Sequence, residues 1–97
     1  MSDDSKTEEF YKKLKIQLAD TALWPAAYLY KFIIPTDTEK IKKVEGIFDN
    51  LGAVITTKQS KNAKYTSVSI NVRMKNPDHV ITKYKEVAEK VEGVISL

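Results

Sequence analysis

The residues best suited to chemistry lie between Tyr65 and Met74, where polar and apolar side chains alternate. This two-residue period is typical of a half-buried strand, with one side turned to a core and the other to solvent. The apolar side carries Thr66, Val68, Ile70, Val72 and Met74. The polar side offers hydroxyl, amide and guanidinium groups, which can hydrogen-bond a partner or pair with an anion. With basic residues expected nearby, the candidate interaction surface comprises Lys31, Lys58, Lys64, Tyr65, Ser67, Ser69, Asn71 and Arg73.

Catalytic and metal chemistry find little support in the sequence. The absence of cysteine excludes disulfides, thiolate zinc sites, iron–sulfur ligation and thiol catalysis. The single histidine, His79, stands beside Asp78 near an expected helix start, a position typical of a helix-surface residue. Asn71 and Arg73 are similar to the asparagine and arginine of acylphosphatases, but those enzymes also need an arginine in a phosphate-cradling loop, which is absent here. No glycine-rich phosphate loop occurs either. We expect no catalysis, no metal and no cofactor.

The strand that begins at Tyr65 requires a partner, and residues 54–59 provide one across a polar connection, residues 60–64. Residues 28–34 predict a further strand, with Tyr28, Tyr30, Phe32 and Ile34 on one side and Lys31 on the other. Residues 94–97 predict a short final strand.

Three helices are expected around these strands. Ser5 and Glu8 have capping-box spacing and predict an amphipathic helix over residues 7–20, which we expect to pack on the rest of the domain. Its apolar positions are Phe10, Tyr11, Leu14 and Leu18. Trp24 and Pro25 interrupt the chain after it. Thr36 and Glu39 form a second capping box before a helix that ends at Gly52. This helix is expected to bury Ile41, Val44, Ile47, Phe48 and Leu51.

The third helix has the clearest start. Asn76 is a favourable cap, Pro77 suits the first helical position, and Asp78 places an acid near the positive helix end. Gly93 is expected to end it. Its inner stripe is predicted to comprise Val80, Ile81, Tyr84, Val87, Ala88 and Val91.

After the first helix, the predicted order is strand, helix, strand, strand, helix, strand. Right-handed crossovers place both helices on one face of a four-stranded antiparallel sheet, with the first and third strands central. The predicted fold class is therefore α+β, ferredoxin-like βαββαβ. We divide the chain into an N-terminal helical extension, residues 1–22, and a ferredoxin-like domain, residues 23–97.

The net charge of +3 is distributed unevenly along the 97 residues. Between Lys31 and Lys75 there are nine basic and four acidic residues, a local surplus that could attract phosphates or an acidic partner. The N-terminus has no signal-peptide pattern, and no apolar stretch approaches the roughly 18 to 20 residues that span a bilayer. We expect a cytoplasmic protein without a membrane segment.

Two stretches resemble a known family. The run WPAAYLYK at residues 24–31 and the run SKNAKYTSVSINV at residues 60–72 are similar to the YbeD-like family of small bacterial proteins of unknown function. The most specific part is Ser60 with Lys64, Tyr65, Ser67 and Val68, and the resemblance covers residues 23–97. A glycine often precedes the lysine in that family, whereas this chain has Ala63. The resemblance implies a fold similar to ACT regulatory domains and no established chemistry.

An ACT-like fold implies a small effector, usually an amino acid, at the turn between the first strand and its helix, at an interface between two copies. In this chain the candidate effector turn is Pro35, Thr36, Asp37 and Thr38. The ligand-binding ACT pattern has glycine there, which lets backbone amides approach the ligand. Thr36 and Glu39 are expected to occupy the amides at this helix start.

The leading prediction is a non-catalytic regulatory or protein-interaction domain that acts through the outer sheet face or a strand edge, as a homodimer. Weak binding of single-stranded nucleic acid is the first alternative, although Ser67, Ser69 and Asn71 stand where base-stacking aromatics would be needed. Binding of a small effector is the second alternative.

Overall fold

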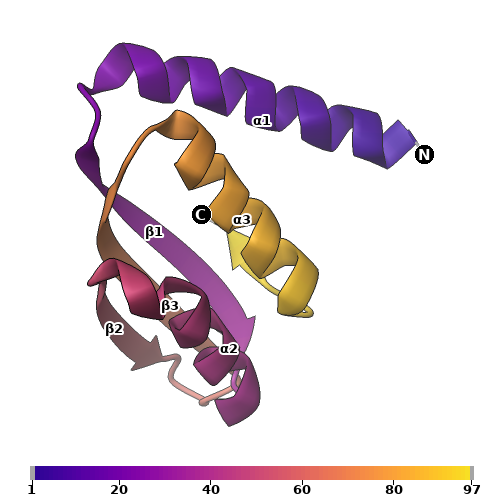
Figure 1. The fold of residues 1–97 in the computed structure, drawn as a ribbon. Helices are drawn as coiled ribbons and strands as arrows, with labels where there is room; N and C mark the ends of the chain where they lie inside the picture. The colour runs from indigo at the N-terminus through magenta and orange to yellow at the C-terminus, as the bar shows by residue number, and fades with distance from the viewer. Residues whose placement is uncertain (1, 97) are drawn as a thin grey trace.

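The computed structural model describes residues 2–96 of the chain, and their side chains from residue 8 onward. Three α-helices, one 3₁₀ turn and four strands follow one another over this range (Figure 1). In order they are α1 (Ser2–Thr21), β1 (Ala26–Pro35), α2 (Thr38–Phe48), η1 (Asp49–Leu51), β2 (Val54–Gln59), β3 (Tyr65–Met74), α3 (Pro77–Lys90) and β4 (Ile95–Ser96).

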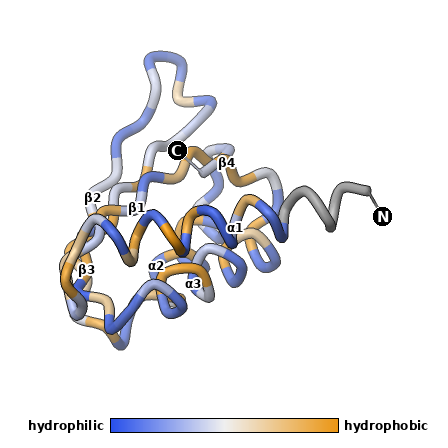
Figure 2. Tube along the Cα trace, turned by 90° about the horizontal axis from the view of Figure 1, so that it is seen from above, coloured by the Kyte–Doolittle hydropathy of each residue, from blue (hydrophilic) through white to orange (hydrophobic). Residues whose placement is uncertain are grey.

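The four strands form one antiparallel sheet in the order β2-β3-β1-β4. This confirms the predicted α+β class and the central positions of β1 and β3. Helices α2 and α3 lie over one face of the sheet, and α1 crosses the end of both layers (Figure 1). Figure 2 shows the connection between β2 and β3 projecting away from the helices, hydrophilic along most of its length.

The core lies between this sheet and the two helices. The alternation predicted for β3 is confirmed, since Thr66, Val68, Ile70, Val72 and Met74 are all buried. From β1 the core receives Tyr30, Phe32 and Ile34, again as the alternation predicts. Pro35 ends β1 opposite Tyr65, at a strand terminus where proline is tolerated.

The start of α2 differs from the prediction. Asp37, not Thr36, is the N-cap, and its carboxylate accepts a hydrogen bond from the amide of Glu39 at 2.9 Å. The Thr36 hydroxyl instead bonds the hydroxyl of buried Thr66 at 2.9 Å. The Thr36–Glu39 capping box is therefore wrong, because Thr36 is used to hold the sheet.

The N-cap of α3 and the role of Gly52 are as predicted. However, α3 ends at Lys90 with Val91 as its C-cap, so the predicted end at Gly93 is wrong, and the predicted second helix is divided into α2 and the 3₁₀ turn η1. The Asn76 side chain accepts from the amide of His79 at 2.8 Å, and Pro77 opens the helix. Gly52 follows η1 with a φ of 68°, the left-handed conformation that glycine adopts without strain. Ala88 is exposed, so its predicted place on the inner stripe of α3 is wrong.

Helix α1 begins at Ser2, so the predicted start at residue 7 is wrong, and the side chain of Ser5 lies outside the described residues. The prediction that α1 packs on its own domain is confirmed. Lys15 pairs with Asp78 at 2.8 Å, and the indole of Trp24 donates to the carbonyl of Leu18 at 2.9 Å. Phe10 is 61% exposed, in contrast to the buried position predicted. Since α1 lies against α3, it leaves the outer face of the sheet uncovered.

Candidate binding face

The side of the sheet turned away from α2 and α3 is called here the open face. Pairing between strands arranges its side chains in cross-strand rows. One row joins Thr56, Ser69 and Lys31, and the next joins Lys58, Ser67, Ile33 and Ile95. The open face comprises Ala27, Leu29, Lys31, Ile33, Pro35, Val54, Thr56, Lys58, Tyr65, Ser67, Ser69, Asn71, Arg73 and Ile95.

Most of the predicted interaction surface is brought together on this face. Lys31 stands directly opposite Ser69, and Lys58 stands opposite Ser67. Residues directly opposite in neighbouring strands have side chains about 5 Å apart, so one partner can contact both. Lys64 lies apart from the face, in the turn between β2 and β3.

Acidic residues are absent from the sheet. The stretches 26–35 and 54–74, which hold β1, β2, β3 and the hairpin turn, contain five of the sixteen basic residues and none of the thirteen acidic ones. The rest of the chain has eleven basic and thirteen acidic residues, a net charge of −2. The five basic residues of these two stretches are Lys31, Lys58 and Arg73 on the strands and Lys61 and Lys64 in the turn.

The open face also carries exposed apolar side chains, which the sequence analysis missed. Leu29 is 51% exposed, Val54 68% and Ile95 53%. Leu29 follows from the alternation of β1, which places it on the same side as Lys31, whereas Val54 and Ile95 depend on strand register. The open face is therefore amphipathic.

A hollow of about 300 Å³ opens where the polar and apolar parts of the face meet. Tyr65 and Ile33 contribute to its wall together with Lys58 and Ser67. Tyr65 is the one aromatic side chain on the open face among the residues that the structure describes. The hollow therefore combines a ring, an aliphatic surface and an amine.

The turn between β2 and β3 is held by its own side chains. The Asn62 carboxamide oxygen accepts from the Lys64 amide at 3.1 Å, and the Ser60 hydroxyl accepts from the Tyr65 amide at 3.2 Å. Ala63 has a φ of 56°, a conformation that glycine adopts without cost.

The candidate effector turn, residues 35–38, is committed to internal contacts. The Thr36 amide donates to the Lys64 carbonyl at 3.0 Å, and the Asp37 carbonyl accepts from the Ile41 amide at 3.0 Å. Asp37 also places a carboxylate at the helix N-terminus, where it repels the anionic end of an amino acid. The turn therefore offers an anionic effector a repulsive environment.

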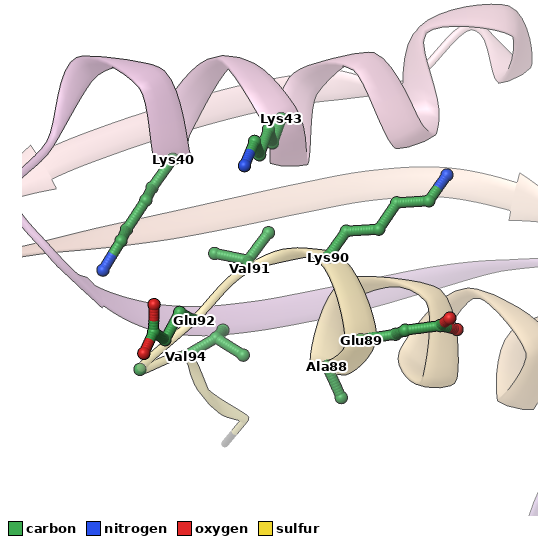
Figure 3. A pocket seen from close by; sticks show the side chains of 9 residues that line it. Lys40, Lys43, Ala88, Glu89, Lys90, Val91, Glu92 and Val94 are labelled. Atoms are coloured by element: carbon green, nitrogen blue, oxygen red, sulfur yellow. The ribbon is translucent and has the colours of Figure 1, made fainter.

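A larger hollow, of about 570 Å³, lies between α2 and the end of α3 (Figure 3). Lys40, Lys43 and Lys90 line it, but so do Glu89 and Glu92. Amines and carboxylates are thus mixed around it, and the hollow selects neither anions nor cations.

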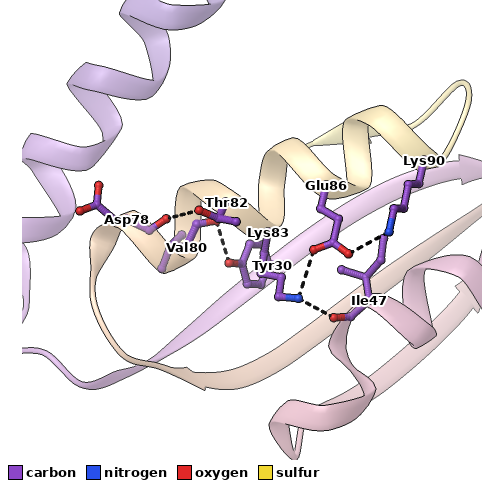
Figure 4. A network of polar contacts seen from close by, with 8 residues as sticks. All are labelled: Tyr30, Ile47, Asp78, Val80, Thr82, Lys83, Glu86 and Lys90. Carbon is purple, nitrogen blue, oxygen red and sulfur yellow. Dashed lines mark hydrogen bonds and ion pairs between the residues drawn. The ribbon is translucent and has the colours of Figure 1, made fainter.

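Polar groups along α3 have partners on β1, on α2 and on α3 itself (Figure 4). The Tyr30 hydroxyl donates to the Val80 carbonyl at 3.0 Å, and burial raises the pKa of Tyr30. The Lys83 amine donates to the Ile47 carbonyl at 2.9 Å and to Glu86 at 3.2 Å. Burial favours a higher pKa for Glu86, but the hydrogen bonds from Lys83 and Lys90 outweigh it and lower this pKa. This network joins the two helices.

His79 lies in the first turn of α3. Its Nδ1 faces the amide of Lys75 at 3.5 Å. Burial, together with the positive charges of Lys83 and Lys75, lowers the pKa of His79. Within residues 2–96, no group of three or more potential metal ligands comes together. No helix in the same range is long and apolar enough to cross a membrane.

Comparison with known proteins identifies a family. A family model described as a protein of unknown function, DUF493, matches residues 20–95. No curated protein and no solved structure matches the chain. The match begins at the end of α1, includes β1, β2, β3, α2 and α3, and ends at Ile95 in β4.

Proposed function

The chain belongs to the DUF493 family of proteins of unknown function, and we propose that it is a non-catalytic binding domain whose open face holds an acidic segment of a partner protein. The observation that carries this proposal is the separation of charge. The strands and hairpin turn hold five basic residues and no acidic residue, while the rest of the chain has a net charge of −2. A face of one sign attracts a partner of the opposite sign and repels others.

The apolar residues of the open face favour a protein as the partner. Leu29 and Val54 flank Asn71, and Ile33 and Ile95 form a second aliphatic pair at the other end of the face. Aliphatic side chains at the centre of a contact contribute by removing apolar area from water, about 25 cal/mol per Å². A segment with acidic residues beside aliphatic ones would use both features.

We extend the proposal to the finer classification of the fold. The order β2-β3-β1-β4 with α2 and α3 on one face supports a ferredoxin-like arrangement, similar to that of ACT regulatory domains. A regulatory role within the YbeD-like group fits this classification. The homodimer predicted from the sequence would then use strand edges, since two copies of the open face carry like charges and repel. Light scattering at micromolar concentration tests this, and a monomer alone contradicts it.

Single-stranded nucleic acid is the second candidate partner. Tyr65, 42% exposed, lies beside Lys58 at the rim of the 300 Å³ hollow and could stack one base. A nucleic acid would leave the aliphatic residues of the open face without partners, and one ring supports one stacked base. For this reason we rank it below a protein segment.

The proposal is tested by fluorescence anisotropy of the full chain with three labelled probes. The first is a decapeptide in which Glu alternates with Leu, the second replaces each Glu by Lys, and the third is a ten-residue oligothymidylate. We expect the acidic peptide to bind most tightly and to weaken as salt is raised. Tighter binding of the oligonucleotide would favour the second candidate, and equal binding of both peptides would contradict a charge-selective face.

The variant Lys31→Glu supplies the site-specific part of this test. Lys31 is exposed at the centre of the open face, so its reversal is expected to weaken the acidic peptide about tenfold, equivalent to ~1.4 kcal/mol. Lys42→Glu is the matched control, because Lys42 is exposed on α2 on the opposite side of the sheet. Equal losses in the two variants would show a general charge effect instead of a site.

A further inference from the structure

Strand β1 has a neighbour along its whole length on one side but along only part of it on the other. β3 pairs with all ten residues of β1, whereas β4 pairs with Phe32 and Ile33 alone. Among residues 2–96, no strand pairs with the outer edge of residues 26–30. Alternate residues of this edge direct an amide and a carbonyl outward, and such groups bind another strand.

A hollow of about 260 Å³ accompanies this edge on the helix side of the sheet. Tyr28 lies in the middle of the unpaired stretch and Ser96 ends β4, and both line the hollow. Helix α1 provides Phe10, Tyr11 and Leu14, and α3 provides Tyr84. The hydroxyls of Tyr28 and Tyr84 bond each other at 2.8 Å, so the two rings present mainly apolar surface. The hollow therefore suits an apolar side chain.

We propose that the outer edge of residues 26–30 binds an extended peptide segment of a partner protein, added antiparallel to β1 in line with β4. In an added strand, the side chain opposite Tyr28 turns to the helix side, as Tyr28 does, and enters the hollow. The next side chain, opposite Leu29, turns to the open face and lies diagonal to Lys31. The proposed segment therefore has an apolar residue, which enters the hollow, next to an acidic residue, which lies near Lys31.

The volume of the hollow and the charges near it favour a peptide segment over a small-molecule ligand or a second copy of the chain. Pockets for drug-sized ligands have volumes of about 300–1,000 Å³, so 260 Å³ suits one or two side chains better than a whole ligand. A second copy of the chain would offer either the same edge of β1, which carries no acidic residue, or its own exposed strand, β2. That strand carries Lys58 and no acid, and it continues into a turn with Lys61 and Lys64. Like charges near Lys31 disfavour this pairing.

The test begins with a library of random dodecapeptides displayed on phage and selected on the full chain. A selected peptide is then synthesised and followed by amide hydrogen exchange. We expect an apolar residue next to an acidic one in the selected sequences, and slower exchange within residues 26–30 when the peptide binds. Slower exchange in β2 instead, or no selected peptide, would overturn the proposal. Slower exchange within residues 26–30 caused by raising the protein concentration alone would also overturn it, in favour of a second copy.

Two substitutions on α1 form a matched pair. Phe10 and Ile16 are 61% and 62% exposed, but only Phe10 lines the hollow. We expect Phe10→Ala to weaken the selected peptide about tenfold, or ~1.4 kcal/mol, and Ile16→Ala to leave it unchanged. Equal effects of the two substitutions would contradict the site.

The proposed site at the edge of β1 and the proposed site on the open face can be refuted separately. Leu14→Trp, which fills the hollow, is expected to abolish binding of the selected peptide and to leave the Glu-Leu decapeptide on the open face unaffected. The melting temperature of this variant is measured alongside, and Phe10→Ala provides the same information if Leu14→Trp is unstable. Loss of both peptides in Phe10→Ala would show that the two sites are not distinct and would overturn the edge site.

Discussion

Replacing Lys83 by methionine is expected to lower the free energy of unfolding by about 2 kcal/mol. The Lys83 side chain is 17% exposed, and its amine donates to the carbonyl of Ile47 in the last turn of α2 and to the carboxylate of Glu86 on its own helix. It therefore satisfies a carbonyl at the negative end of one helix and fastens that helix to another. Methionine keeps an apolar stem of similar length but donates no hydrogen bond.

The magnitude follows from the two contacts that are lost. A hydrogen bond that involves a charged group contributes about 1.5–3 kcal/mol. A partly exposed ion pair adds about 0.2–1 kcal/mol, which Glu86 partly recovers through Lys90 at 3.2 Å. For a domain of this size, 1 kcal/mol corresponds to a change of about 4–8 °C in melting temperature. We therefore expect Lys83→Met to melt about 8–16 °C lower.

Urea denaturation followed by circular dichroism measures this change, and calorimetry provides the melting temperature. Lys90→Met is the control, because it removes an exposed ion pair to the same carboxylate without touching α2, and should cost less than about 0.5 kcal/mol. If the two substitutions cost the same, Lys83 does not join the helices as described.

Three further predictions concern other parts of the fold. Ala63→Gly should raise the free energy of unfolding by about 0.5 kcal/mol. Glycine adopts the positive φ of this position without strain, although its greater freedom in the unfolded chain offsets part of the gain. A lower stability in urea would contradict the turn geometry. Tyr28→Phe should cost about 1 kcal/mol by leaving the Tyr84 hydroxyl without its partner, and an unchanged urea midpoint would refute that contact. Because folding lowers the pKa of His79, the unfolded chain binds more protons than the folded chain at pH values just below the usual histidine pKa of 6.5. The free energy of unfolding should therefore fall as the pH drops from 7.5 to 5.5. His79→Gln should reduce this fall, and identical pH profiles of melting temperature would exclude the effect.

The elements with a strict period were predicted well from the sequence. The bounds of β2 and β3 are confirmed at both ends, because alternation and a polar turn leave one register that buries the apolar side. The start of α3 is confirmed because Asn76 and Pro77 each favour one position at a helix start.

Other details depend on contacts between distant residues. Thr36 and Asp37 can both cap a helix, and the choice is made by Thr66, thirty positions away, which takes the Thr36 hydroxyl. Ala88 lies at the margin of the inner stripe of α3, where a small rotation decides exposure. The local sequence pattern therefore predicts neither the choice of cap for α2 nor the exposure of Ala88.

The candidate surface was predicted in its polar half only. Ser67, Ser69 and Lys31 share a face because alternation requires it. The aliphatic residues Val54 and Ile95 lie on the same face because of the register in which β2 pairs with β3 and β4 pairs with β1. A sheet face is assembled from several strands, so its full composition appears only when their order and register are known.

The binding role of the open face is tested most directly by mapping where a partner contacts the chain. Nuclear magnetic resonance spectra of the labelled full chain, titrated with the Glu-Leu decapeptide, report the amides whose environment changes. The proposed function predicts that the largest shifts fall at Lys31, Ser67, Ser69 and Asn71 and disappear in Lys31→Glu. Shifts concentrated on α2 and α3, or shifts that persist in that variant, would contradict it.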